Sequence, residues 1–168
     1  MKRFYDWLGE EAVGRKIWWY IFLFVIGNLI YCSVVIYLLQ CIGVHLHERK
    51  NLGISFVTWS FFFLLLIDLA FEELFFRIPL IIPITLSWST RAILLYAIPF
   101  SIVFGLLHGG FLNILIQGVA GFGLCILALK CGGLQGRPVR GFLVAYIAHV
   151  LFDITIFAIV FFQGTHTI

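Results

Sequence analysis

The sequence predicts an all-α protein, a polytopic membrane bundle of about five transmembrane helices, from its composition and its long uncharged runs. Of its 168 residues, 62% are hydrophobic and 11% are charged, whereas soluble domains average about 45–50% apolar and about 25% charged residues. Several uncharged runs approach or exceed about 18 residues, the length that crosses the hydrocarbon core of a bilayer. We expect the spans to be helical, because lipid offers no partner for an unpaired backbone group.

The first predicted span covers residues 17–42 and follows a polar N-terminal segment at 1–16. It is entered through Trp18, Trp19 and Tyr20, the aromatic residues expected at a membrane interface. The apolar run is too long for the hydrophobic region of a signal peptide, and it lacks a small-residue cleavage site. We therefore expect a signal-anchor helix that stays in the protein.

The remaining spans form a predicted helical core at residues 53–162. A polar loop, HLHERKN at 45–51, precedes the second span, which starts near Gly53 and is bent or ended by Pro79 and Pro83. The other three spans are expected at 91–109, with a kink at Pro99, at 111–131 and at 142–162. One domain of 168 residues accounts for the chain.

The distribution of Lys and Arg predicts the orientation of these spans. With five spans, most basic residues fall on the side of the N-terminus, so we expect a cytoplasmic N-terminus in a multi-pass protein of the cell membrane. The net charge of +3 is too small and too dispersed to indicate nucleic-acid binding. The partners expected from composition are therefore the lipid bilayer and molecules within it.

Two sets of small residues are expected to serve packing alone. The cysteines lack C-x-x-C spacing and are interpreted as small buried side chains: Cys32, Cys41, Cys125 and Cys131. The glycines of the third and fourth spans let helix backbones approach closely: Gly105, Gly109, Gly118, Gly121 and Gly123.

The stretch FEELFFR, residues 71–77, places charges inside the second predicted span, one turn after Asp68. Four charges at mid-membrane cost on the order of 10 kcal/mol on the insertion scale. Glu73 and Arg77 are one turn apart with the acid first, so they are expected to form an ion pair. Glu72 lies over Asp68 instead, and the repulsion between two carboxylates favours a proton shared between them. Intramembrane ionisable residues are usually functional, the alternative being a buried packing network.

A second copy of the same Glu-Glu-x-x-x-Arg spacing occurs in EEAVGR, residues 10–15. It lies in a polar stretch outside the predicted spans. We expect this copy to be a solvated or interfacial segment rather than part of a site.

Ionisable side chains occur inside two other predicted spans. FGLLHGG places His108 near the end of the third span, and HVLFD places His149 and Asp153 on one face of the fifth. At about 1.5 Å per residue, Glu72 falls at a depth similar to that of His149 and Asp153. His108 lies deeper, so helix tilt and bending are needed to bring it level. Taken singly, each histidine is explained equally well by a hydrogen bond to a backbone carbonyl.

A carboxylate and two imidazoles at one depth can activate water in two ways. In the first, Glu72 acts as general base, His108 holds the water and His149 donates to the oxyanion. In the second, a glutamate and the histidines bind a zinc ion that acidifies the water. The candidate zinc ligands are Glu73, His108 and His149.

Three motifs, each on its own predicted membrane helix and in this order, resemble those of the CPBP/Abi family. They are Glu72-Glu73-x-x-x-Arg77, Phe104-x-x-x-His108 and His149-x-x-x-Asp153. The family contains the type II CAAX prenyl endopeptidases and related bacterial membrane proteases, several linked to bacteriocin self-immunity. The resemblance covers roughly residues 60–160 and leaves the N-terminal segment and the first helix outside.

The resemblance also implies roles for the motif residues. Glu72 would be the catalytic carboxylate that activates water, with His108 as its partner, while Glu73 and Arg77 would support the site. His149 and Asp153 would stabilise the oxyanion or, in a metalloprotease, help to bind the metal.

Asp153 stands where the eukaryotic CAAX enzymes have Asn. An ionised Asp accepts hydrogen bonds but cannot donate one to an oxyanion. If Asp153 takes part in catalysis, it is therefore either protonated or orients His149.

These observations predict an intramembrane peptidase, of glutamic or metallo type, that acts on a peptide or protein substrate within or at a bacterial plasma membrane. CAAX-type cleavage, bacteriocin or peptide processing and self-immunity are the expected settings, although a prenylated substrate is not implied by so short a chain. One alternative is a non-catalytic binding or immunity protein on the same scaffold. Another is a carrier, with haem between His108 and His149 or protons relayed by the acidic helix.

Overall fold

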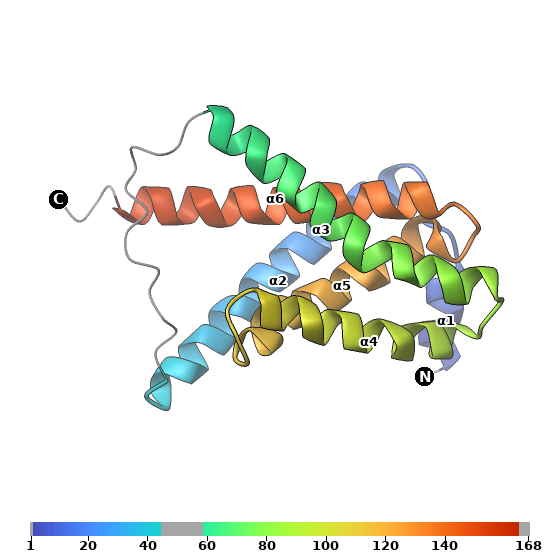
Figure 1. The fold of residues 1–168 in the computed structure, drawn as a ribbon, viewed down its shortest axis with the longest axis horizontal. Coiled ribbons are helices and arrows are strands. Elements are labelled where there is room, and N and C mark those ends of the chain that lie inside the picture. The colour runs from blue at the N-terminus through green and yellow to red at the C-terminus, as the bar shows by residue number, and fades with distance from the viewer. Residues whose placement is uncertain (1, 45–58, 165–168) are drawn as a thin grey trace.

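A computed structural model describes residues 2–44 and 59–164 (Figure 1). The elements are α1 (Lys2–Gly9), α2 (Arg15–Cys41), α3 (Trp59–Thr85), α4 (Thr90–Leu107), η2 (Ile114–Gly118), α5 (Val119–Ala128), η3 (Leu129–Gly133) and α6 (Pro138–Gly164). All are helical and the described residues form no strand, which confirms the predicted fold class. The predicted loop at 45–51 and the start of the second span near Gly53 lie outside the described residues.

Four segments are long and apolar enough to cross a membrane: Arg15–Cys41, Thr90–Leu107, Ile114–Gly133 and Pro138–Ile159. Helix α3 is as long as α2, with 27 residues each, but it carries the charged FEELFFR stretch. Together they give the five long helical segments expected from the sequence. The protein is thus a multi-pass membrane protein, and the orientation of its N-terminus stays a prediction.

The prolines do not end the helices that contain them, contrary to one of the two outcomes expected for α3. Pro79 and Pro83 lie inside α3, which continues to Thr85, and Pro99 lies inside α4. Membrane helices tolerate proline because neighbouring helices and local adjustments satisfy the freed backbone groups. The turn after α3 ends where Ser89 caps α4 by accepting a hydrogen bond from the backbone nitrogen of Ala92.

The segment predicted as one regular helix at 111–131 is more irregular. It begins as the π-helix η2, continues as α5 and ends in η3, where the backbone is kinked at Cys131 and Gly132. π-Helical turns are rare and frequently lie at functional sites. Here the turn at residues 108–113 joins α4 to η2, and His108 is the first residue of that turn.

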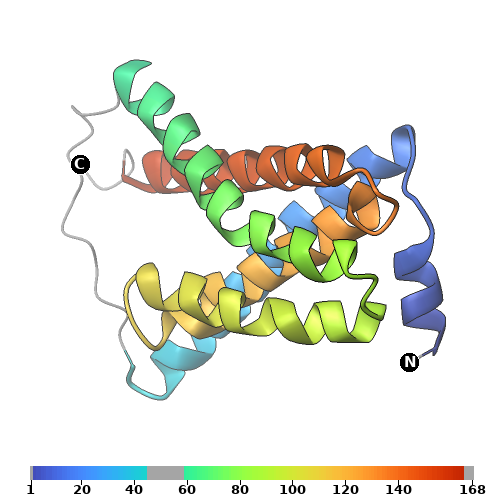
Figure 2. The ribbon, with the colours of Figure 1, turned by 45° about the vertical axis from the view of Figure 1, so that its right-hand side comes forward.

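Helix α6 lies against three other helices. It contacts α2, α3 and α5, while α3 also contacts α4 (Figures 1 and 2). In both views α3 crosses α6 obliquely, with α4 on its other side. The motif-bearing helices α3, α4 and α6 therefore lie beside one another.

Glycines allow the close packing of α4 against the segment that follows it, as expected. A Cβ atom added at Gly105 would lie 2.6 Å from Cα of Ile114, and one added at Gly121 would lie 2.8 Å from the ring of Phe104. Real side chains essentially never approach that closely. Among the cysteines, Cys41 is exposed, whereas the other three are buried and all four are free: Cys32, Cys41, Cys125 and Cys131.

The N-terminal segment was expected to be simply polar, but it contains α1 and packs against the bundle. Leu8 is fully buried beside Ile93 and Leu129. The buried ammonium of Lys130 donates hydrogen bonds to the carbonyls of Trp7 and Glu10. The segment after α1 is held as well, because Glu11 accepts hydrogen bonds from both Arg137 and Arg140.

Candidate active site

Glu73 is the centre of a buried network that joins α3 to α6. Its side chain is 0% exposed. Arg77, one turn later on α3, donates from Nε to Oε2 at 3.0 Å and from Nη2 to Oε1 at 3.1 Å. His149 of α6 approaches Oε1 with Nδ1 at 3.0 Å. Both carboxylate oxygens of Glu73 are therefore occupied by side chains of the protein.

Arg77 has a second partner besides Glu73, which the sequence did not reveal. Its Nη1 atom donates to Sγ of Cys125 at 3.2 Å. Cys125 belongs to α5 and is 0% exposed. No spacing connects it with Arg77 in the sequence, and it had been assigned to packing alone.

Glu72 faces a different helix from Glu73. Its Oε1 atom lies 3.5 Å from Nε2 of His108, and the side chains are 24% and 26% exposed. The second oxygen, Oε2, is buried and has no hydrogen-bond partner among the described residues. An unpaired buried carboxylate oxygen is costly, so this atom marks a place where a further polar group is needed.

The end of α4 fixes the orientation of His108. Its Nδ1 atom lies 2.7 Å from the carbonyl of Phe104, which can only accept, so Nδ1 donates and Nε2 faces Glu72. Asn113 donates from Nδ2 to the carbonyl of His108 at 2.8 Å. The chain can turn here because Gly109 has a φ of 132°, a conformation that suits glycine.

Both histidines contact one aromatic ring, that of Phe104. The ring centroid of Phe104 is 4.3 Å from that of His108 and 5.9 Å from that of His149. The Nε2 atom of His149 is not bound to Glu73 and lies 4.0 Å from Oδ1 of Asp153. Glu73 thus holds the nitrogen Nδ1 of His149, and Asp153 lies nearest to the other nitrogen.

The depth estimate had separated His108 from the other candidates, yet α4 brings it to Glu72. Asp68, in contrast, is exposed on α3, and no ion pair or hydrogen bond joins it to Glu72 in the described part of the chain.

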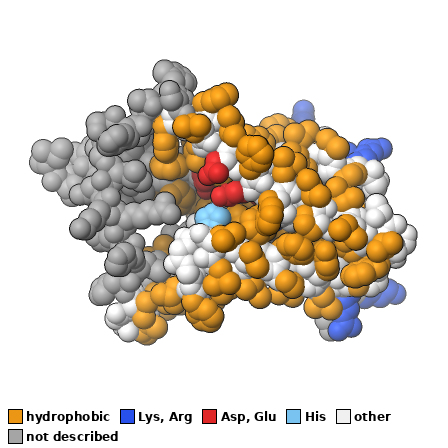
Figure 3. All heavy atoms as spheres, in the orientation of Figure 1, with side chains coloured by type: hydrophobic (Ala, Val, Ile, Leu, Met, Phe, Trp, Pro, Cys, Tyr) orange, Lys and Arg blue, Asp and Glu red, His pale blue; other side chains and the backbone are white. Residues whose placement is uncertain are grey.

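Figure 3 shows acidic side chains and a histidine gathered at one spot of a largely hydrophobic face, with Lys and Arg at the opposite end.

The side chains present do not fit the predicted zinc site. The residues that the structure describes include no group of three or more that could hold a metal ion. Glu73 already accepts from Arg77, and Nδ1 of His149 is bound to Glu73. The candidate ligands Glu73 and His149 therefore bind each other, and they do not converge with His108 on one point where a metal ion could lie.

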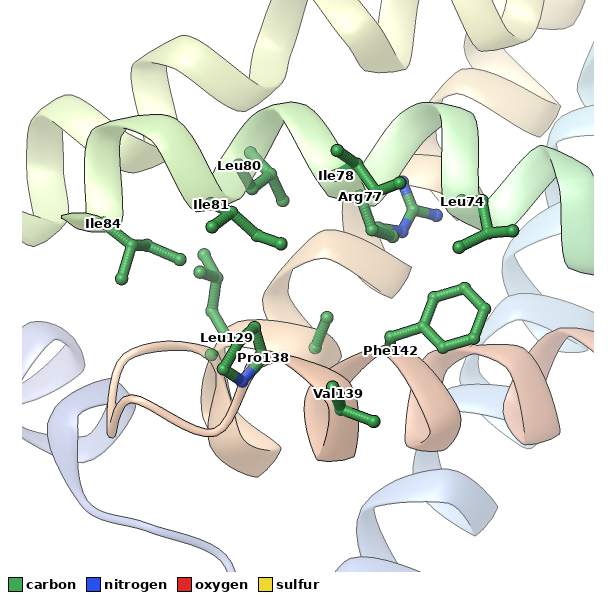
Figure 4. Close-up of a pocket in the computed structure, with 12 residues that line it drawn as sticks. Leu74, Arg77, Ile78, Leu80, Ile81, Ile84, Leu129, Pro138, Val139 and Phe142 are labelled. Atoms are coloured by element: carbon green, nitrogen blue, oxygen red, sulfur yellow. The ribbon is translucent and has the colours of Figure 1, made fainter.

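An apolar groove between α3 and α6 borders the Glu73 network, because Arg77 is one of its lining residues. It has a volume of about 340 Å³. In Figure 4, Ile78 and Ile81 of α3 lie above Pro138 and Val139 of α6, and Arg77 lies between Ile78 and Leu74. The groove is not lined by Glu72 or by either histidine, so it does not open onto the paired Glu–His site.

The fold and the cluster together describe a polytopic membrane protein with ionisable motifs on three helices of one bundle. The chain belongs to the Rce1-like family, because the family model for type II CAAX prenyl endopeptidase Rce1-like proteins matches residues 54–155, more than half of the chain. The matched range contains every candidate site residue and leaves α1 and α2 outside. Comparison with curated proteins and with solved structures finds no match.

Proposed function

We propose that the protein is an endopeptidase that hydrolyses a peptide bond at the membrane with a water molecule activated by Glu72 and His108. The observation that carries the proposal is the pairing of these two side chains beside the unpartnered Oε2 atom of Glu72. A water molecule bound there would satisfy this atom and would lie within reach of a general base. Membership of the Rce1-like family supports peptide-bond hydrolysis.

In the proposed reaction, Glu72 takes a proton from the water as the water oxygen attacks the carbonyl carbon. The carbonyl electrons move onto oxygen and form an oxyanion. When the C–N bond breaks, the leaving amine receives the proton that Glu72 took, so the pair returns to its starting state. His108 holds the carboxylate in place, since its Nδ1 atom is fixed by the carbonyl of Phe104.

His149 is the proposed oxyanion donor. Because its Nδ1 atom is bound to Glu73, its Nε2 atom is the one left to face a substrate. A protonated Nε2 would donate a hydrogen bond to the oxyanion, and the neighbouring Asp153 carboxylate would stabilise the positive charge. In this arrangement Asp153 acts through His149 and need not donate a hydrogen bond itself.

We propose that the substrate is a peptide or protein segment within or at the membrane, in the setting of peptide processing or bacteriocin self-immunity. The motif order and the family support a protease, while a non-catalytic binding protein on the same scaffold is the alternative. The two differ in one respect, because only the protease requires the carboxylate of Glu72.

The test compares new peptide N-termini in membranes that contain the wild type or Glu72→Gln at equal levels. Glu10→Gln is a matched control, since it changes the first glutamate of the other Glu-Glu-x-x-x-Arg copy, which is exposed. We expect termini that occur with the wild type and with Glu10→Gln but not with Glu72→Gln. Identical termini in all three samples, in the native host, would refute proteolysis and favour the binding protein. Loss of cleavage on chelation, with recovery on adding zinc, would instead support metal-dependent hydrolysis.

A further inference from the structure

A buried line of polar contacts joins three helices and ends at His149. It starts with Cys125 of α5, whose sulfur accepts a hydrogen bond from Arg77 of α3. Arg77 holds Glu73, which in turn holds His149 of α6. Each of these four residues is at most 5% exposed. Cys125 belongs to none of the three sequence motifs.

The surroundings of Cys125 explain why its sulfur matters to Arg77. The thiol packs with the side chains of Leu80 and Ala97, neither of which can accept a hydrogen bond. A guanidinium carries five N–H donors in a rigid fork, and a buried donor without a partner costs free energy. The Nε and Nη2 atoms of Arg77 donate to Glu73. The Nη1 atom does not reach Glu73 and donates to the sulfur of Cys125 instead.

We propose that Cys125 is a positioning residue that holds the Arg77 guanidinium in its two-pronged contact with Glu73, and thereby fixes the imidazole of His149. Its bearing on catalysis rests on the proposed function, whereas its effect on His149 does not. Cys125 need not touch the substrate in this role.

A pair of substitutions separates the role of an acceptor from that of packing. Cys125→Ser keeps a hydrogen-bond acceptor in a slightly smaller side chain, whereas Cys125→Val removes the acceptor and leaves a somewhat larger apolar side chain. Cys32→Val is the matched control, because Cys32 is also a buried thiol in a membrane helix but packs in a separate cluster around α2. If packing alone mattered, Cys125→Ser would behave like Cys125→Ala, which is close to it in size but has no acceptor.

The first readout does not depend on catalysis. In protein labelled with nitrogen-15 at histidine and held in detergent micelles, the Nδ1 proton of His149 should give a signal protected from exchange by Glu73. His149→Gln assigns that signal. We expect it to persist in Cys125→Ser and Cys32→Val and to be lost in Cys125→Val. If Cys125→Val does not fold, Cys125→Ala removes the acceptor without adding bulk, and the same loss is expected.

The second readout is the cleavage rate of a substrate found in the terminus comparison. We expect Cys125→Val to lower kcat by about tenfold with little change in KM, the size typical for residues that orient those at a reacting centre. Cys125→Ser should recover most of the loss. In an Arg77→Lys background, Cys125→Val should have no further effect, because its partner has gone.

The outcomes separate the two proposals. A protected His149 signal that survives in Cys125→Val or Cys125→Ala overturns the positioning role, as does a wild type without the signal. Equal kcat in Cys125→Val and Cys125→Ser also overturns it. Absence of cleavage in the wild type refutes the proposed function alone, since the His149 signal still tests Cys125.

Discussion

Glu72 and Glu73 are neighbours on α3, yet their carboxylates face different helices. Glu73 is fully buried and bound by Arg77 and His149, whereas Glu72 is 24% exposed and lies beside His108 of α4. The difference follows from helix geometry, because successive side chains point about 100° apart around the axis. One carboxylate is therefore used to join helices, and the other keeps an oxygen free.

This division predicts that Glu→Gln mainly lowers stability at position 73 and mainly abolishes cleavage at position 72. Glu73→Gln removes one partner of a buried ion pair and should lower the free energy of unfolding by about 3–5 kcal/mol. Glu72→Gln should change it by only about 1 kcal/mol, since its partner is partly exposed, while abolishing cleavage. Thermal unfolding in detergent and the terminus comparison measure the two effects. Equal unfolding midpoints for the two variants would contradict the assigned division.

The proposed roles of Glu72 and His149 predict a bell-shaped dependence of the cleavage rate on pH. At low pH a proton on the Glu72 carboxylate removes the general base, so the rate falls. At high pH no proton is left on Nε2 of His149 to donate to the oxyanion, so the rate falls again. In His149→Gln the alkaline limb should change shape while the acid limb remains. Rates that do not vary with pH would count against acid–base catalysis by these groups.

Close packing around Gly105 predicts that even a methyl group there is harmful. Gly105→Ala would place Cβ 2.6 Å from the backbone of Ile114, forcing apart α4 and η2. We expect a loss of about 1–3 kcal/mol in unfolding free energy, and lower activity because His108 lies one turn away. Gly27→Ala is the control, since no atom lies within 4 Å of its added Cβ and alanine favours a helix. Similar stability of the two variants would show that the contact is looser than described.

The buried Lys130 predicts that the N-terminal segment can be released by one substitution. Lys130→Met leaves the carbonyls of Trp7 and Glu10 without their charged partner and removes the ammonium that lies 4.7 Å from the Trp7 ring. Since hydrogen bonds to charged groups are worth about 1.5–3 kcal/mol, cleavage by a protease specific for acidic residues should rise about tenfold or more at Glu10. Lys16→Met, which changes an exposed lysine, should leave the cleavage rate unaltered. If Lys130→Met is cut no faster than the wild type, Lys130 does not hold the segment.

Local features of the chain were predictable because they depend on few residues. Long apolar runs predicted the membrane helices, since a hydrophobic run of that length is stable only when it spans lipid. The contact of Glu73 with Arg77 followed from a spacing of one turn, which the helix itself brings together. The end of α3 was less predictable, because neighbouring helices decide whether a membrane helix can continue through Pro79 and Pro83.

The sequence by itself thus determined the helical membrane class, the family motifs and the charged helix that carries Glu72 and Glu73. The family resemblance had paired Glu72 with His108, but only the tertiary structure showed that His149 contacts Glu73, because that contact depends on how α6 is rotated and placed against α3. The tertiary structure also decided that Cys125, in a helix without a motif, accepts a hydrogen bond from Arg77, and that Lys130 donates hydrogen bonds to the N-terminal segment. Such contacts join residues far apart in the chain, and no local periodicity records which side chains a buried interface will bring together.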